Sequence, residues 1–270
     1  MSSEEVKRVL EEFGGTVGLL DYMASAEDDI KNGTRKRDLL KEAELYTDLI
    51  RYFFNHDNNF RYAVSQDPKK LDYILVLLVL SGNLDKAEKA LEYARHHRIS
   101  GDKNFIINIL LQYYLETHNY DIVNFLLKYF PNEVNSEILK LSEYLSKLTK
   151  QDLDKFISDK RIHGENKIIM ISKISDKLTI EEMINYYKQL SGAINRWGLE
   201  NIISGVLLKN KDDRIDKLSY VLKNYSQLIP SESIKEWMET VITSHSGKLT
   251  KDDIVILSML LDVEKSRLKR

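Results

Sequence analysis

Apolar residues recur every three or four positions along much of this 270-residue chain, which is the spacing of an amphipathic helix. No segment of five or more residues alternates between apolar and polar positions as a half-buried strand does. Only three prolines and eleven glycines interrupt the pattern, and this scarcity favours helix. The sequence therefore predicts an all-α fold. One clear helical stripe is formed by Leu39, Leu40, Ala43, Tyr46, Leu49, Ile50, Phe53 and Phe54.

Turn residues and caps place the helix boundaries. Asp67 and Pro68 are typical of an N-cap followed by a first helical residue, and the helix that they begin should end at Ser81-Gly82. Most of the Ser-Gly pairs, at 81–82, 100–101, 191–192, 204–205 and 246–247, look like helix ends. After the helix at 68–80, we expect helices near 85–97, 104–117, 121–130, 137–147, 150–161, 166–176, 180–190, 199–209, 213–225, 231–243 and 250–269.

The dipeptide Leu-Thr occurs at 148–149, 178–179 and 249–250, and an acid follows each threonine by three residues: Asp152, Glu182 and Asp253. This spacing indicates a capping box, in which the hydroxyl and the acid each bind a backbone N–H. Ser25 and Asp28 have the same spacing. We interpret all four pairs as helix caps rather than as catalytic dyads.

Two stretches of the chain match at an offset of 36 residues. They are "GNLDKAEKALEYA" (82–94) and "HNYDIVNFLLKYF" (118–130), and each follows an apolar helix. Asn83 aligns with Asn119, and Leu91 aligns with Leu127. A period in the mid-thirties that contains two helices and two turns is typical of a stacked helical repeat.

The first of these units resembles a tetratricopeptide repeat (TPR). The matching positions are Leu75, Leu78, Gly82, Ala87, Leu91 and Ala94. The second unit departs from the pattern, because His118 replaces the glycine and Val123 and Phe130 replace the alanines. The resemblance covers about 68–131 and implies an α-solenoid, with an irregular helical bundle as the alternative. We therefore expect an N-terminal helical cap at 1–64, a repeat pair at 65–135 and a C-terminal helical region at 136–270.

The resemblance also implies a binding surface, the concave groove lined by the first helix of each unit. In this chain its lining would be Lys69, Asp72, Val76, Asn108, Gln112 and Glu116. The set lacks the Lys/Asn/Arg combination with which family members hold a peptide carboxylate. The implied function is a protein-interaction or scaffold role, with another protein or a second copy of the chain as partner.

Composition excludes several classes of protein. The chain has no cysteine, so disulfide scaffolds, Cys-based zinc sites and cysteine nucleophiles are ruled out. The longest apolar run, "YILVLLVL" at 73–80, is too short to cross a bilayer, which takes about 20 residues. The N-terminus is acidic and amphipathic, unlike a signal peptide, so we expect a cytoplasmic protein without membrane association.

No motif names a reaction. His96 and His97 are adjacent, so on a helix they point about 100° apart and cannot share a metal ion. "FGGTVG" (13–18) lacks the lysine of a phosphate loop and is interpreted as a turn between helices. We expect no enzyme activity, metal or cofactor. An enzyme would need a buried cluster of acids and histidines from separate helices.

Two basic segments leave an alternative open, a helical protein that binds nucleic acid. The net charge of −2 argues against a chain that coats nucleic acid along its length, but a local patch remains compatible with it. The candidate contacts are Arg35, Lys36, Arg37, Arg267, Lys269 and Arg270. The segment 249–270 vaguely resembles a helix-turn-helix, with a turn at Asp262, although a solvated basic helix end explains it more simply.

Overall fold

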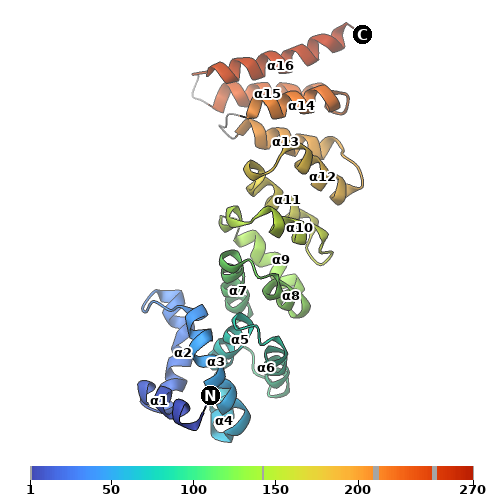
Figure 1. Ribbon diagram of the computed structural model, residues 1–270. Helices are drawn as coiled ribbons and strands as arrows, with labels where there is room; N and C mark the ends of the chain where they lie inside the picture. The colour runs from blue at the N-terminus through green and yellow to red at the C-terminus, as the bar shows by residue number, and fades with distance from the viewer. Residues whose placement is uncertain (1, 142, 209–212, 245–247, 270) are drawn as a thin grey trace. The chain divides into compact units, whose positions relative to one another are not determined.

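The computed structural model describes residues 2–141, 143–208, 213–244 and 248–269, apart from the side chains of residues 3 and 208. These residues form sixteen α-helices and three short 3-10 helices, and no strand occurs among them (Figure 1). The all-α prediction is therefore confirmed. Within the described residues, no helix combines the length and the apolar character needed to span a membrane.

The chain divides into two compact units, Met1–Tyr144 and Leu145–Arg270. This division differs from the three segments expected from the sequence. The N-terminal helices do not form a separate cap, because α2 (Thr16–Asn32) and α3 (Leu39–His56) pack directly against α5 (Pro68–Leu80). Residues 2–64 and the helix pair that follows them thus share one core.

Helix α5 is the centre of the first unit. It contacts α2, α3, α4, α6, α7 and α8, and its nine residues from Leu71 to Val79 are all buried. The longest apolar run of the sequence is therefore a core helix. The remaining helices of the unit are α1 (Ser3–Phe13), α4 (Asn58–Gln66), α6 (Leu84–His96), α7 (Lys103–Thr117), α8 (Tyr120–Tyr129) and α9 (Pro131–Lys140).

The second unit repeats one packing relation. Each helix from α10 to α14 contacts the helix two positions further along, and most neighbouring pairs also pack together. The core is therefore built up along the chain. The helices are α10 (Lys150–Ser158), α11 (Gly164–Lys173), α12 (Ile180–Ser191), α13 (Arg196–Leu208), α14 (Arg214–Tyr225), α15 (Ser231–Ser244) and α16 (Lys251–Leu268), with η1 (Tyr144–Lys147), η2 (Ser175–Lys177) and η3 (Ser226–Leu228) as short links.

Three of the four predicted capping boxes are confirmed. Thr149, Thr179 and Thr250 each begin a helix, and each forms both reciprocal hydrogen bonds with the acid three residues later. The prediction for Ser25 is wrong, because Ser25 lies inside α2 and its hydroxyl donates to the carbonyl of Tyr22. Ser2 and Glu5 form a capping box that was not predicted.

Most helix boundaries agree with the predictions to within a few residues, and α5 agrees at both ends. The helix expected at 137–147 is wrong, because Pro131 occupies the first helical position of α9 and that helix ends at Lys140. Gly205 lies inside α13 rather than at a helix end. The Ser-Gly pair at 246–247 lies outside the described residues.

The two aligned turns share a backbone conformation. Gly82 and His118 both follow a helix with positive φ, at 74° and 55°. Asn83 and Asn119 are the N-caps of α6 and α8. The small residues buried on α6 are Ala87 and Ala90, whereas Ala94 is only half-buried. Within "FGGTVG", Gly14 and Gly15 form the turn between α1 and α2, both with positive φ, while residues 16–18 already belong to α2.

Candidate functional site

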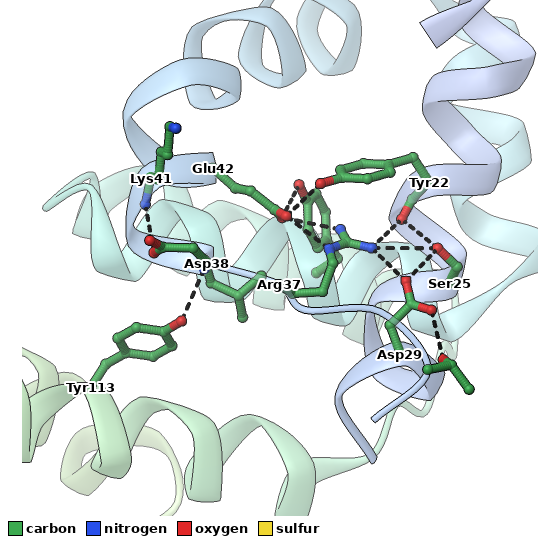
Figure 2. Close-up of polar contacts among 11 residues, drawn as sticks. Tyr22, Ser25, Asp29, Arg37, Asp38, Lys41, Glu42 and Tyr113 are labelled. Carbon is green, nitrogen blue, oxygen red and sulfur yellow. Dashed lines mark hydrogen bonds and ion pairs between the residues drawn. The ribbon is translucent and has the colours of Figure 1, made fainter. Parts of the chain in front are cut away.

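A buried polar cluster in the first unit surrounds Arg37, in the link between α2 and α3 (Figure 2). The Arg37 side chain is fully buried, with 0% of its surface exposed. Its Nε and Nη2 donate to the two carboxylate oxygens of Glu42, at 2.7 and 3.0 Å. Its Nη1 forms an ion pair with Asp29 at 3.0 Å. One cation thus binds two acids from different helices.

Aromatic side chains complete the cluster. The guanidinium carbon of Arg37 lies 3.7 Å from the centre of the Tyr22 ring, which is a cation–π contact. The hydroxyls of Tyr22 and Tyr73 donate to the two oxygens of Glu42, at 2.5 and 2.9 Å. Arg37 Nη1 also donates to the Tyr22 carbonyl at 3.2 Å. Figure 2 shows Tyr22 and Asp29 of α2 and Glu42 near the start of α3 gathered around Arg37. Tyr73 joins them from α5.

The electrostatics of the cluster suit a fastening role. Burial, followed by the hydrogen bond to Glu42, raises the pKa of Tyr22 well above its usual range. Burial and the Glu42 charge raise the pKa of Tyr73 in the same way. Both phenols therefore stay protonated at neutral pH and keep donating to Glu42. Because these groups already bind one another, the cluster holds α2, α3 and α5 together rather than binding a ligand.

A further contact attaches α7 to the same region. The Tyr113 hydroxyl accepts a hydrogen bond from the backbone N–H of Leu39 at 2.9 Å (Figure 2). Asp38, the N-cap of α3, accepts from the N–H of Lys41. Sequence reasoning missed Glu42 as a member of this cluster. A usable signal existed, since Glu42 stands on the apolar stripe of α3, where a charge needs a buried partner.

The structure places the predicted groove residues in different environments. Asp72 and Val76 are buried, with 5% and 1% of their surface exposed, so the prediction that they line an open surface is wrong. The reason is that α2 and α3 cover α5. Asp72 accepts a hydrogen bond from the backbone N–H of Asp102 at 2.9 Å. Lys69 forms an ion pair with Asp28 of α2 at 2.8 Å.

The predicted residues on α7 are partly engaged within the fold. Gln112 donates to Asn108 at 2.5 Å, and Asn108 donates to the buried carboxylate of Glu137 on α9 at 3.4 Å. Glu116 is exposed. Binding of a partner by Lys69, Asn108, Gln112 and Glu116 stays a prediction.

The structure places the residues of the first basic segment in different environments. Arg37 is buried in its cluster, so its predicted contact with nucleic acid is wrong. Arg35 and Lys36 are exposed, and the Arg35 guanidinium lies 5.0 Å from the Tyr22 ring centre.

At the other basic segment, Arg267 donates to the carbonyls of Ser226 and Ile229 at 2.7 and 2.5 Å, so its guanidinium is held within the fold. α16 runs unbroken through Asp262, so the vague resemblance to a helix-turn-helix does not hold and the simpler interpretation, a basic helix end, agrees with the structure. Lys269 is exposed, and Arg270 lies outside the described residues.

No metal centre is found in the part of the chain that the structure describes: no three His, Asp or Glu residues there are grouped to hold an ion. The His96 and His97 rings lie nearly perpendicular, with centres 5.0 Å apart. Comparison of the chain with known protein families, with curated proteins and with solved structures finds no match.

Proposed function

We propose that this chain is a non-enzymatic interaction protein, which docks another protein or a second copy of itself on surfaces formed by its stacked helices. The observation that carries the proposal is the outer face of α16. Ile254, Leu261 and Leu268 recur there at intervals of seven residues and are 57%, 41% and 87% exposed. Residues seven apart lie on one stripe of a helix, so these three exposed apolar side chains share one side of α16.

The opposite side of the same helix is already buried. Asp253, Ile256 and Leu260 face the core, and α16 packs on α14 and α15. A helix that is apolar on two faces is typical of one that packs between two layers. Exposed apolar residues gathered on one side of a helix mark an interaction surface in many proteins. The outer stripe of α16 therefore suits a helix supplied by a partner.

The packing within each unit supports an α-solenoid as the scaffold of this function. In the second unit, helices contact their second neighbours along the chain, as expected when helix pairs stack. In the first unit, the matching turns at Gly82 and His118 support a TPR-like pair at about 68–131. Nucleic-acid binding has less support, since two of its predicted contacts, Arg37 and Arg267, are engaged within the fold.

The test replaces two residues of the outer stripe in the full chain, Ile254→Glu with Leu261→Glu. The matched control is Val17→Glu with Leu45→Glu, which changes two exposed apolar residues of the first unit. Sedimentation velocity measures self-association, and cross-linking with mass spectrometry measures binding of other proteins. We expect the α16 variant to lose association that the wild type and the control retain. A wild type that stays monomeric and cross-links to the same proteins as the α16 variant would contradict the proposal.

The predicted residues of α7 are tested separately. Asn108→Ala with Gln112→Ala removes both amides while leaving α16 unchanged. If the variant keeps every cross-linked partner of the wild type, the α7 surface is not a binding site and the α16 face remains. A selective loss of partners would assign that binding to α7.

A further inference from the structure

Four helices of the first unit enclose a pocket on one side of α5. Helix α3 forms one wall and α6 the other, α5 forms the floor, and α4 closes one end. The sequence spacing fits this arrangement, because Lys86, Lys89, Ala90 and Tyr93 share one face of α6. The pocket has a volume of about 180 Å³ and opens to solvent. This volume is smaller than that of most small-molecule sites, so it suits a single side chain rather than a whole small ligand.

Every charged residue that lines this basic pocket is a cation. Arg51 comes from α3, Arg61 from α4, and Lys86 and Lys89 from α6. The whole chain carries a net charge of −2, so the pocket has the opposite sign to the protein. Four cations that converge from three helices raise the local concentration of an anionic ligand.

The donors of these cations are largely uncommitted. Lys86 and Lys89 have no hydrogen bond or ion pair with any residue that the structure describes. Arg61 donates to the neutral amide of Asn58 rather than to an acid. Arg51 pairs with Asp48 at 3.2 Å, but its Nε is buried and finds no partner among the described residues. A buried donor without an acceptor costs free energy, so the Arg51 guanidinium is not fully satisfied by Asp48.

The base of the basic pocket is apolar. Ile50, Ile74, Leu78 and Ala90 line it, and all four are buried. On the walls, the Phe54 and Tyr93 rings pack edge to face with their centres 5.1 Å apart. The Tyr93 hydroxyl donates to the Arg61 carbonyl at 3.0 Å, which ties α4 to α6. The walls are therefore fixed before any ligand binds.

We infer that the basic pocket binds an acidic peptide segment of a partner protein. One apolar side chain of the segment lies on the floor of the pocket, and flanking carboxylates pair with the cations at its rim. A single-stranded nucleic acid fits less well, because its bases need free aromatic faces. Here Phe54 packs on Tyr93, and the centres of the Tyr93 and His97 rings lie 4.1 Å apart, so these aromatic faces are already occupied.

This inference does not rest on the α16 face, which belongs to the other unit. The test uses the full chain and fluorescence anisotropy at low salt. The probe is an end-blocked eight-residue peptide of aspartate and glutamate with one central leucine. We expect binding that weakens at least tenfold when Lys86→Glu is combined with Lys89→Glu, since rim charges attract the peptide. The matched control, Lys7→Glu with Lys41→Glu, changes two exposed lysines away from the pocket and keeps the wild-type affinity.

Changes in the probe make the test independent of protein folding. A peptide with serine in place of leucine should bind at least tenfold more weakly, and a peptide of asparagine and glutamine around the leucine should not bind. The inference fails if the acidic peptide does not bind, if the serine peptide binds equally well, or if an oligothymidine binds more tightly than the peptide. The Ile254→Glu and Leu261→Glu variant should bind the peptide normally. Lost peptide binding with intact association through α16 would thus remove only this inference.

Discussion

Asp72 is the residue whose burial has the clearest consequence for pH dependence. Its carboxylate is 5% exposed and lies between α5 and the turn before α7. Burial raises its pKa from 3.8 to about 6, against the opposing effect of the hydrogen bond from Asp102. The charges of Glu27 and Asp102 raise the pKa further, whereas Lys31 lowers it. The folded protein therefore binds this proton more tightly than the unfolded chain does.

The sign of the linkage follows from that difference. Protonated Asp72 stabilises the fold below about pH 4, and this stabilisation is lost as the pH rises through about 6. Asp72→Asn keeps an acceptor for the Asp102 N–H but carries no charge. We expect the variant to exceed the wild type in unfolding free energy by about 1 to 3 kcal/mol at pH 8, and to match it near pH 4. Urea unfolding at both pH values measures this. An equal effect of the exposed control Asp28→Asn would contradict the explanation.

Gly101 lies close to the Asp72 carboxylate. A Cβ atom at position 101 would lie 1.8 Å from Asp72 Oδ1, so the Asp72 side chain would have to shift and strain its hydrogen bond from the Asp102 N–H. We expect Gly101→Ala to lower the unfolding free energy by about 1 to 3 kcal/mol, the usual cost of overpacking. Gly205, within α13, has nothing near its missing Cβ. Gly205→Ala should therefore stabilise the protein slightly, and thermal unfolding compares the two. Equal effects would show that local packing does not decide the outcome.

At the scale of helices, Arg37 joins α2 to α3 and to the central helix α5. Arg37→Ala would leave Glu42 and Asp29 without their cation, and Glu42 is buried. Removing one partner of a buried ion pair typically costs about 3 to 5 kcal/mol. We expect a loss of this size in urea unfolding followed by circular dichroism. Arg35→Ala is the matched control, since Arg35 is exposed and should change the unfolding free energy little. Similar losses in both variants would contradict the fastening role.

Arg267 has a similar role in the second unit, where it joins α16 to η3 and to the residue that follows η3. It donates to two backbone carbonyls, at Ser226 and Ile229, and to Glu264. We expect Arg267→Ala to cost about 1 to 3 kcal/mol, because those carbonyls lose a charged donor. Lys269 is exposed and lies two residues further along, so Lys269→Ala should leave the unfolding free energy unchanged. Urea unfolding followed by tryptophan fluorescence makes the comparison, and a neutral Arg267→Ala would show that these contacts add no stability.

The same two arginines show what the sequence could and could not predict. Helices and their caps depend on residues close together in the chain, so α5 and the boxes at Thr149, Thr179 and Thr250 were predicted. Burial of Arg37 depends on Tyr22 and Tyr73, which come from two other helices. No local pattern separates this arginine from the exposed Arg35 beside it. The basic pocket was not predicted for the same reason, since its four cations come from three separate helices.

At the scale of the whole chain, two compact units each have their own core. Units of this kind can unfold in separate transitions. Both tryptophans, Trp197 and Trp237, belong to the second unit, so tryptophan fluorescence reports on that unit alone. Circular dichroism reports on helices of both units.

This difference between the probes separates the units without cutting the chain. We expect Arg37→Ala to shift the circular dichroism transition to lower urea while the tryptophan midpoint stays at its wild-type value. Arg267→Ala should shift the tryptophan midpoint, because the contacts that it removes lie in the second unit. If each variant instead moves both curves together, the chain unfolds as one cooperative body. In that case the two cores support each other, and the energetic effects of Arg37 and Arg267 belong to the whole molecule rather than to its parts.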